Sequence, residues 1–144
     1  MIQPQSKVEL HLPNELGYEK VAIVSIAKAA QKAGFCREKI EDLKSALAEA
    51  CTNAIEHGNS LNAQARLSIV CTVYSDSIQV SVIDEGHQPI PISPPDRSER
   101  SDHRGMGLHL MPKLVDKFEI KSQPGRNEVQ MTNFLNTRPL PALR

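Results

Sequence analysis

The chain has 144 residues, with 17 basic and 17 acidic side chains and a formal net charge of zero at pH 7. A balanced charge gives no electrostatic indication of binding to nucleic acid or to a membrane surface. Aromatic residues make up 3% of the chain, without a tryptophan, which argues against recognition of single-stranded nucleic acid by base stacking.

The cysteines and the hydrophobicity pattern indicate the compartment. Cys36, Cys51 and Cys71 are an odd number without C-x-x-C spacing, so neither a disulfide framework nor a zinc site is expected. The first residues do not form a secretion signal, and no apolar run approaches the roughly 20 residues that span a bilayer. The sequence therefore predicts a cytoplasmic protein, and its length suits a single domain, residues 1–144.

Strand and helix patterns alternate in the first half of the chain. Residues 7–12 read K-V-E-L-H-L and predict a short strand that Pro13 ends. Asn14 is expected to cap a helix that runs to about residue 33. Residues 37–57 carry apolar side chains at helical spacing and predict a second helix.

Two hairpins are predicted in the second half. Residues 67–73 and 78–83 alternate apolar and polar side chains across a short polar turn. Residues 117–122 and 128–135 predict a second hairpin across a Pro-Gly turn. All four strands have the short length that is typical of sheets in small domains.

The segments between and after the hairpins complete the fold prediction. Residues 86–103 contain four prolines and are not expected to form a regular element, whereas residues 106–115 return to a helical pattern. The tail, residues 136–144, is expected to be frayed. This order predicts an α+β two-layer sandwich, a mixed, mostly antiparallel sheet covered on one face by about three helices.

One decapeptide carries the first functional indication. Residues 49–58 read E-A-C-T-N-A-I-E-H-G, and Glu49, Asn53 and His57 line up at four-residue spacing beside the apolar stripe. Leaving such polar groups buried and unpaired costs roughly 1–3 kcal/mol each, so a polar partner is expected. From these ten residues alone, a helix edge that faces water is an equally good interpretation.

Two later segments favour a ligand. A strand-like run ends at Asp84 and is followed by Gly86, while Gly105 and Gly107 precede the last helical pattern. Glycines let the backbone approach a ligand closely, and a helix N-terminus offers unpaired N–H groups to a phosphate. Each segment alone is a weak signal, because both patterns also occur in ordinary turns.

The order of the three segments resembles the N, G1 and G2 boxes of the GHKL ATPase superfamily of gyrase-type, chaperone, histidine-kinase and mismatch-repair ATP-binding domains. Within it, the chain most resembles the anti-sigma-factor serine-protein kinases, from about residue 10 to residue 135. The most specific stretches are I-E-D-L-K-S-A-L-A-E-A-C-T-N-A-I-E-H-G at 40–58 and R-G-M-G-L-H-L-M at 104–111. The resemblance implies a Bergerat-type ATP-binding fold.

The resemblance also implies roles for individual residues. Asp84 would accept a hydrogen bond from the adenine amino group, and Gly86 would leave room for the base. Asn53 would coordinate Mg²⁺, an ion that prefers oxygen ligands, and Glu49 would be the general base for the attacking hydroxyl. A turn aspartate and a helix-edge asparagine that bonds a neighbouring backbone group remain as alternatives.

The same resemblance assigns the phosphates of ATP to Arg104, Gly105, Met106, Gly107 and Leu108. Arg104 would reach the γ-phosphate or, alternatively, face solvent. Thr132 would place a hydroxyl near adenine, although a strand threonine needs no such role, and His57 is interpreted as structural. Residues 86–104 would form the ATP lid, with an exposed insertion as the alternative.

Two positions depart from the family pattern. Gln88 stands where relatives often have a second glycine, and Asn133 follows Thr132 where many members have a lysine. These changes weaken the expectation of phosphate transfer more than that of nucleotide binding. The chain has no G-x-x-x-x-G-K-[ST] motif, which excludes a P-loop kinase.

What the resemblance implies is a homodimeric partner-switching kinase that binds ATP with Mg²⁺. It would hold a sigma factor off the polymerase, or phosphorylate a small anti-anti-sigma (STAS) protein on serine or threonine. The alternative is a nucleotide-gated module that sequesters its partner without phosphate transfer. A detached ATPase segment of a sensor histidine kinase is disfavoured, because no histidine-bearing dimerisation helix is recognised before residue 40.

Overall fold

The computed structural model describes residues 3–60, 62–87 and 111–135. These residues form an α+β fold, as the sequence predicts, and residues 111–114 are also helical. The named elements are β1 (Pro4–Pro13), α1 (Glu19–Lys32), α2 (Arg37–Asn53), the π-helical turn η1 (Ala54–Gly58), β2 (Arg66–Tyr74), β3 (Ser77–Asp84), β4 (Lys117–Gln123) and β5 (Arg126–Phe134).

The five strands form one sheet in the order β1-β2-β3-β5-β4. Each described pairing is antiparallel, where a mixed, mostly antiparallel sheet was expected. Both predicted hairpins are confirmed, and β5 inserts between β3 and β4, so that the last strand is an inner strand beside the central strand β3. As a result, the end of β3 lies beside the beginning of β5, with Asp84 paired to Asn127.

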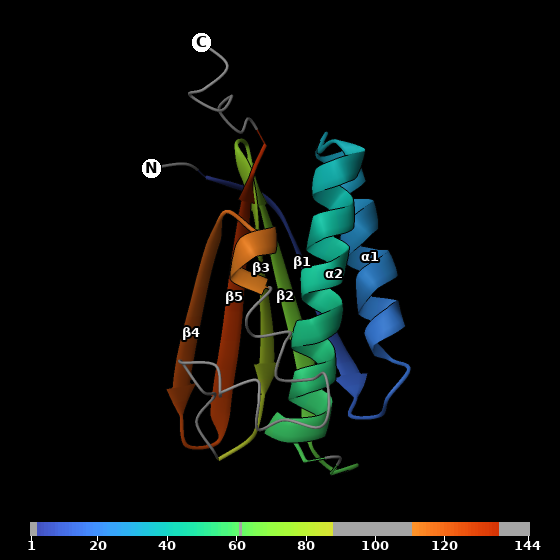
Figure 1. The fold of residues 1–144 in the computed structure, drawn as a ribbon, viewed down its shortest axis with the longest axis vertical. Helices are drawn as coiled ribbons and strands as arrows, with labels where there is room; N and C mark the ends of the chain where they lie inside the picture. The colour runs from blue at the N-terminus through green and yellow to red at the C-terminus, as the bar shows by residue number, and fades with distance from the viewer. Residues whose placement is uncertain (1–2, 61, 88–110, 136–144) are drawn as a thin grey trace, which may run out of the picture.

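The core lies between the sheet and the helices. In Figure 1, α1 and α2 lie side by side on one face of the sheet. Alternate residues of β3, Ile78, Val80 and Val82, point into the core, as the period-two pattern of a strand requires. Leu47 of α2 is fully buried against this face, so its replacement by alanine would lower the free energy of unfolding by about 2–5 kcal/mol.

Helix α1 begins later than the sequence predicts. Asn14 does not cap it, because its amide Nδ2 donates to the carbonyl of Asn62 and its Oδ1 accepts from Asn59. The N-cap is instead Tyr18, which makes no side-chain capping bond. A tertiary contact has therefore replaced the expected local one at this buried asparagine.

The second helix changes type near its end. It is α-helical only to Asn53, and the next five residues form η1, in which the Asn59 N–H donates to the carbonyl of Ala54 over 2.7 Å. Short π-helical segments of this kind occur frequently at functional sites. The wider turn changes the direction in which Gly58 and Asn59 leave the helix.

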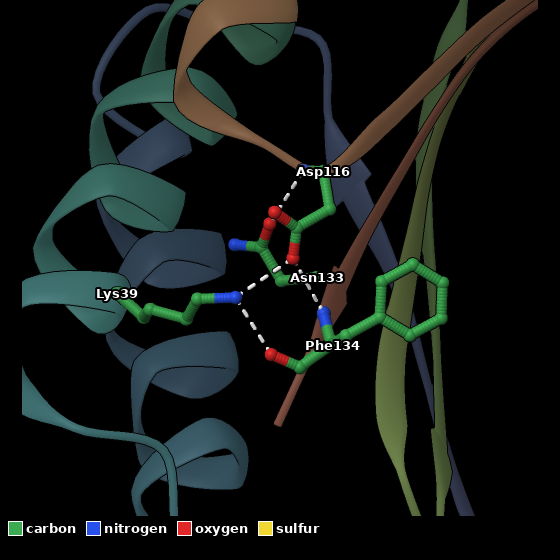
Figure 2. Close-up of polar contacts among 4 residues, drawn as sticks. All are labelled: Lys39, Asp116, Asn133 and Phe134. Atoms are coloured by element: carbon green, nitrogen blue, oxygen red, sulfur yellow. Dashed lines mark hydrogen bonds and ion pairs between the residues drawn. The ribbon is translucent and has the colours of Figure 1, made fainter. Parts of the chain in front are cut away.

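A polar cluster, drawn in Figure 2, ties α2 to the sheet. It lies beside Phe134, at the other end of the β3–β5 pair from Asp84. The Lys39 ammonium donates to Asp116 Oδ2 over 2.7 Å and to the Phe134 carbonyl over 2.6 Å. Asp116 Oδ2 also accepts from the Phe134 N–H, and the Asp116 N–H donates to Asn133 Oδ1. Asn133, singled out as a departure from the family, thus holds the residue that precedes β4.

Several predictions fall outside the described residues. Most of the expected lid, residues 104–108 that were predicted to bind phosphate, and the tail 136–144 belong to this part of the chain. Of the helix predicted at 106–115, the structure describes residues 111–114 as helical. Among the described helices, none is long and apolar enough to cross a membrane.

Candidate functional site

Asp84, the last residue of β3, is the centre of the candidate site. Its side chain is buried, and its Oδ1 accepts from the Gly86 N–H over 2.8 Å and from Asn127 Nδ2 over 3.1 Å. Among the described residues, no group donates to Oδ2. One carboxylate oxygen is thus fixed by hydrogen bonds, while the other lies against Gly58 and keeps its capacity to accept a hydrogen bond.

Burial raises the pKa of the Asp84 carboxyl above its usual value, although the bonds from Gly86 and Asn127 act in the opposite direction. A carboxylate that is poorly solvated gains more from a new hydrogen bond than one that faces water. Asp84 is therefore suited to bind an N–H donor such as an exocyclic amino group.

Two glycines let the end of η1 lie directly on the Asp84 turn. A methyl group at Gly58 would collide with the Asp84 carboxylate, and one at Gly86 would collide with the carbonyl of Gly58. The β4–β5 turn lies on the opposite side, where the Gly125 N–H donates to the Gly86 carbonyl over 3.1 Å. Glycine is required at both positions because the segments approach each other too closely for a side chain.

Glu49 and Asn53 lie one helical turn apart on α2, and η1 continues from Asn53 to the Asp84 turn. Burial, together with the nearby charge of Glu56, raises the pKa of the Glu49 carboxyl. The Asn53 Nδ2 is buried and finds no hydrogen-bond partner in the described part of the chain. Because a half-turn of the amide exchanges its oxygen and nitrogen, one end of this amide is available to a ligand.

The structure does not place the remaining predicted residues beside Asp84. Thr132 does not join the group, because it pairs with Gln79 and Lys117 and lies out of phase with the core residues Val129 and Met131. Strand alternation therefore directs its side chain to the sheet face opposite the helices. His57 is exposed, and residues 104–108 lie outside the described residues.

Asn127, to which the sequence analysis gave no role, lies beside Asp84. Its Nδ2 donates to both Asp84 Oδ1 and the Gly86 carbonyl, and the side chain is almost fully buried. The prediction began the last strand at residue 128, whereas β5 begins at Arg126. Only the long-range pairing of β3 with β5 could have identified Asn127, since nothing local distinguishes it.

These features fit an adenine nucleotide and its metal ion. Asp84 offers an acceptor on a turn that two glycines bring against η1, and Asn53 offers a buried Nδ2 without a partner among the described residues. Glu49 adds a partly buried carboxylate one turn away from that amide. The arrangement thus supplies an acceptor for a base, an amide for a cation and a candidate proton acceptor on adjoining segments.

Comparison with known proteins decides the family. The model of the histidine kinase-like ATPase domain matches residues 12–133. The chain is 31% identical to the serine-protein kinase RsbW of Bacillus subtilis, over 90% of this chain and 86% of that protein. The serine-protein kinase RsbW of Bacillus velezensis gives the same figures, and that of Bacillus cereus is 29% identical over 94% and 89%. The chain belongs to the histidine kinase-like ATPase family of serine-protein kinases.

Solved structures support the fold. The RsbU and RsbW domains of a Mycobacterium tuberculosis protein align with a TM-score of 0.68 at 18% identity, over 90% of this chain and 32% of that one. A blue-light activated histidine kinase domain from Erythrobacter litoralis aligns with a TM-score of 0.55 at 19% identity, over 86% and 62%. Family membership implies that this serine-protein kinase binds ATP.

Proposed function

We propose that this kinase binds ATP with Mg²⁺ and transfers the γ-phosphoryl group to a serine or threonine of an anti-anti-sigma (STAS) protein. In its other complex it sequesters a sigma factor. The observation that carries the proposal is the order of three groups along one helical segment. These are the partly buried Glu49, the Asn53 Nδ2 that has no partner among the described residues, and Gly58 against Asp84.

Asp84 binds the adenine. Its Oδ2 accepts from the exocyclic amino group, while Oδ1 remains bonded to Gly86 and Asn127. Gly86 lets the turn lie against η1 beside the base, because a side chain at this position would collide with the Gly58 carbonyl. A carbonyl group in place of the amino group would put two hydrogen-bond acceptors, its oxygen and the Asp84 carboxylate, against each other. The site therefore selects adenine.

Glu49 acts as the general base. It accepts the proton of the attacking hydroxyl as the new oxygen–phosphorus bond forms and the bond to the β-phosphate oxygen breaks, which releases ADP. Its raised pKa makes it a stronger base than an exposed glutamate, although it must still be ionised to act. Asn53 holds Mg²⁺, and residues 104–108 contribute backbone N–H groups to the phosphates. When bound, Mg²⁺ neutralises phosphate charge.

Phosphate on the partner would end its binding. A phosphoserine carries about −1.5 to −2 charges at pH 7, enough to disrupt an interface by repulsion or desolvation.

We propose that the protein acts in the cytoplasm as a homodimer of single-domain chains. Leu16, Val21 and Val24 support a protein interface, because they are exposed apolar side chains on and beside α1.

Phosphate transfer with γ-labelled ATP tests the proposal. The wild type is expected to label a candidate STAS protein in the presence of Mg²⁺, whereas Glu49→Gln should bind ATP but transfer no label. Glu41→Gln is the matched control, since Glu41 lies on the same helix and bonds Lys44 on its exposed side. If the wild type binds nucleotide but transfers no label, the alternative function is favoured, a nucleotide-gated module. Gln88, which replaces a glycine of the family pattern, is the sequence feature that supports this alternative. Absence of nucleotide binding would refute both functions.

A further inference from the structure

Asn59, which the proposed function does not use, holds the turn that carries Asp84. It follows η1 directly and is only 4% exposed. Its Oδ1 accepts from the Glu85 N–H over 2.8 Å, between Asp84 and Gly86. Its Nδ2 donates to Asn14 Oδ1 over 2.9 Å and to the Arg66 carbonyl over 3.1 Å. A buried amide with both ends bonded in this way has one orientation.

Each contact of Asn59 comes from a different segment. Asn14 lies between β1 and α1, Arg66 begins β2, and Glu85 follows β3. The Glu85 carboxylate strengthens the same junction, because its Oε1 accepts from the Arg66 N–H over 2.9 Å. Asn59 is thus the point at which the end of the helical segment is joined to the start of β2 and to the adenine-side turn.

Backbone groups of the turn are held from two sides. Asn127 and Gly125 hold Gly86 from the sheet side, whereas Asn59 holds Glu85 from the helix side. Without Asn59, the Glu85 N–H would lose its acceptor, and the turn that carries Asp84 would lose its hydrogen bond to the helix side. A carboxylate free to move is a weaker and less selective acceptor for one amino group.

We infer that Asn59 is a positioning residue that keeps Asp84 selective for adenine. The inference rests on the proposed binding of the adenine amino group by Asp84. Asn59 does not touch the base itself, and its effect passes through the Glu85 N–H. Selectivity is therefore the property that distinguishes this role from a contribution to stability alone.

The test compares ATP with ITP, which carries a carbonyl oxygen in place of the adenine amino group. Titration calorimetry should give a wild-type preference for ATP, and Asn59→Ala should reduce the ATP-to-ITP affinity ratio by about 3- to 10-fold, the equivalent of one lost hydrogen bond. An unchanged ratio would overturn the inference. A wild type with no preference for ATP would instead refute the role of Asp84.

Asn14→Ala is the matched control. Asn14 is equally buried and bonds the same amide, but it does not touch the turn, and Asn59 keeps its bond to the Arg66 carbonyl. Both variants should unfold at lower urea concentration, whereas only Asn59→Ala should change the ratio. An equal change in Asn14→Ala would show that selectivity follows general destabilisation and would overturn the inference.

A measurement on the wild type needs no variant to fold. In the nucleotide-free protein, the Glu85 amide is expected to exchange its hydrogen slowly, because a buried acceptor holds it. Exchange as fast as that of an unbonded loop amide would contradict a fixed turn. This result would stand even if Asn59→Ala proved insoluble.

Discussion

Asp84 and Glu49 are both carboxylates with a raised pKa, but their surroundings differ. The Asp84 side chain is fixed in position by hydrogen bonds to one of its oxygens. For Glu49, burial and the charge of Glu56 raise the pKa of the carboxyl. A fixed acceptor suits recognition, and a strengthened base suits proton transfer. Two residues of the same chemistry are thus separated into two roles by what touches them.

Asp84→Asn should bind ATP about 10- to 100-fold more weakly than the wild type. The amide can still accept from Gly86 and Asn127 through Oδ1, so the turn should keep its shape, but its Nδ2 would face the adenine amino group. Loss of a hydrogen bond to a charged group is worth about 1.5–3 kcal/mol. Calorimetry with ATP measures the loss, and unchanged affinity would exclude Asp84 from the base site.

The rate of phosphate transfer should fall on the acid side of its pH profile as Glu49 is protonated. Because the pKa of Glu49 is raised, this loss should begin at higher pH than for an ordinary glutamate. Glu56→Gln removes the neighbouring negative charge and should move the acid limb to lower pH. Single-turnover rates across the pH range measure the shift, and an acid limb that stays in place would contradict charge coupling between Glu49 and Glu56.

At the scale of elements, the sequence predicted what depends on local periodicity. Helices and hairpins followed from apolar spacing, and the Pro-Gly turn between β4 and β5 was recognised from its two residues. The π-helical turn η1 was not predicted, because its apolar residues continue the same stripe as α2. Asn14 was given the wrong role and Asn127 was missed for a shared reason: their partners, Asn59 and Asp84, are distant in sequence.

The Lys39 cluster yields a prediction for the joint between α2 and the sheet. Lys39→Met should lower the free energy of unfolding by about 1–2 kcal/mol, because Asp116 and the Phe134 carbonyl both lose a charged donor at a partly exposed site. Lys39→Arg keeps the charge and should recover part of the loss. Urea unfolding measures both variants.

The adenine affinity of folded Lys39→Met should stay close to that of the wild type, because the cluster lies at the end of β5 remote from Asp84. Asp116→Asn combined with Lys39→Met should destabilise by less than the sum of the single changes, as expected for directly bonded groups. Simple additivity would mean that the ion pair contributes nothing to the joint.

At the scale of the whole molecule, the two carboxyl groups of the candidate site make the free energy of unfolding fall as pH rises. Asp84 and Glu49 have higher pKa values in the folded chain than their ordinary values of 3.8 and 4.5. Their contribution to stability is therefore fully present below the unfolded values and is lost as pH rises through the folded values. Glu128 behaves oppositely. Burial alone would raise its pKa, but bonds from Ser81 and Arg126 and nearby positive charges lower it, so its contribution is lost as pH falls.

Replacement of both site carboxylates by amides should therefore make the protein more stable relative to the wild type as pH increases. In urea titrations between about pH 4 and pH 8, the free energy of unfolding of Glu49→Gln/Asp84→Asn should rise against that of the wild type. A difference of one between folded and unfolded pKa values corresponds to about 1.4 kcal/mol. Glu128→Gln should show the opposite trend, with its loss of stability greatest at neutral pH. A pH-independent difference for the double variant would mean that the buried site carries no electrostatic strain, and that these carboxylates are retained at no expense to the fold.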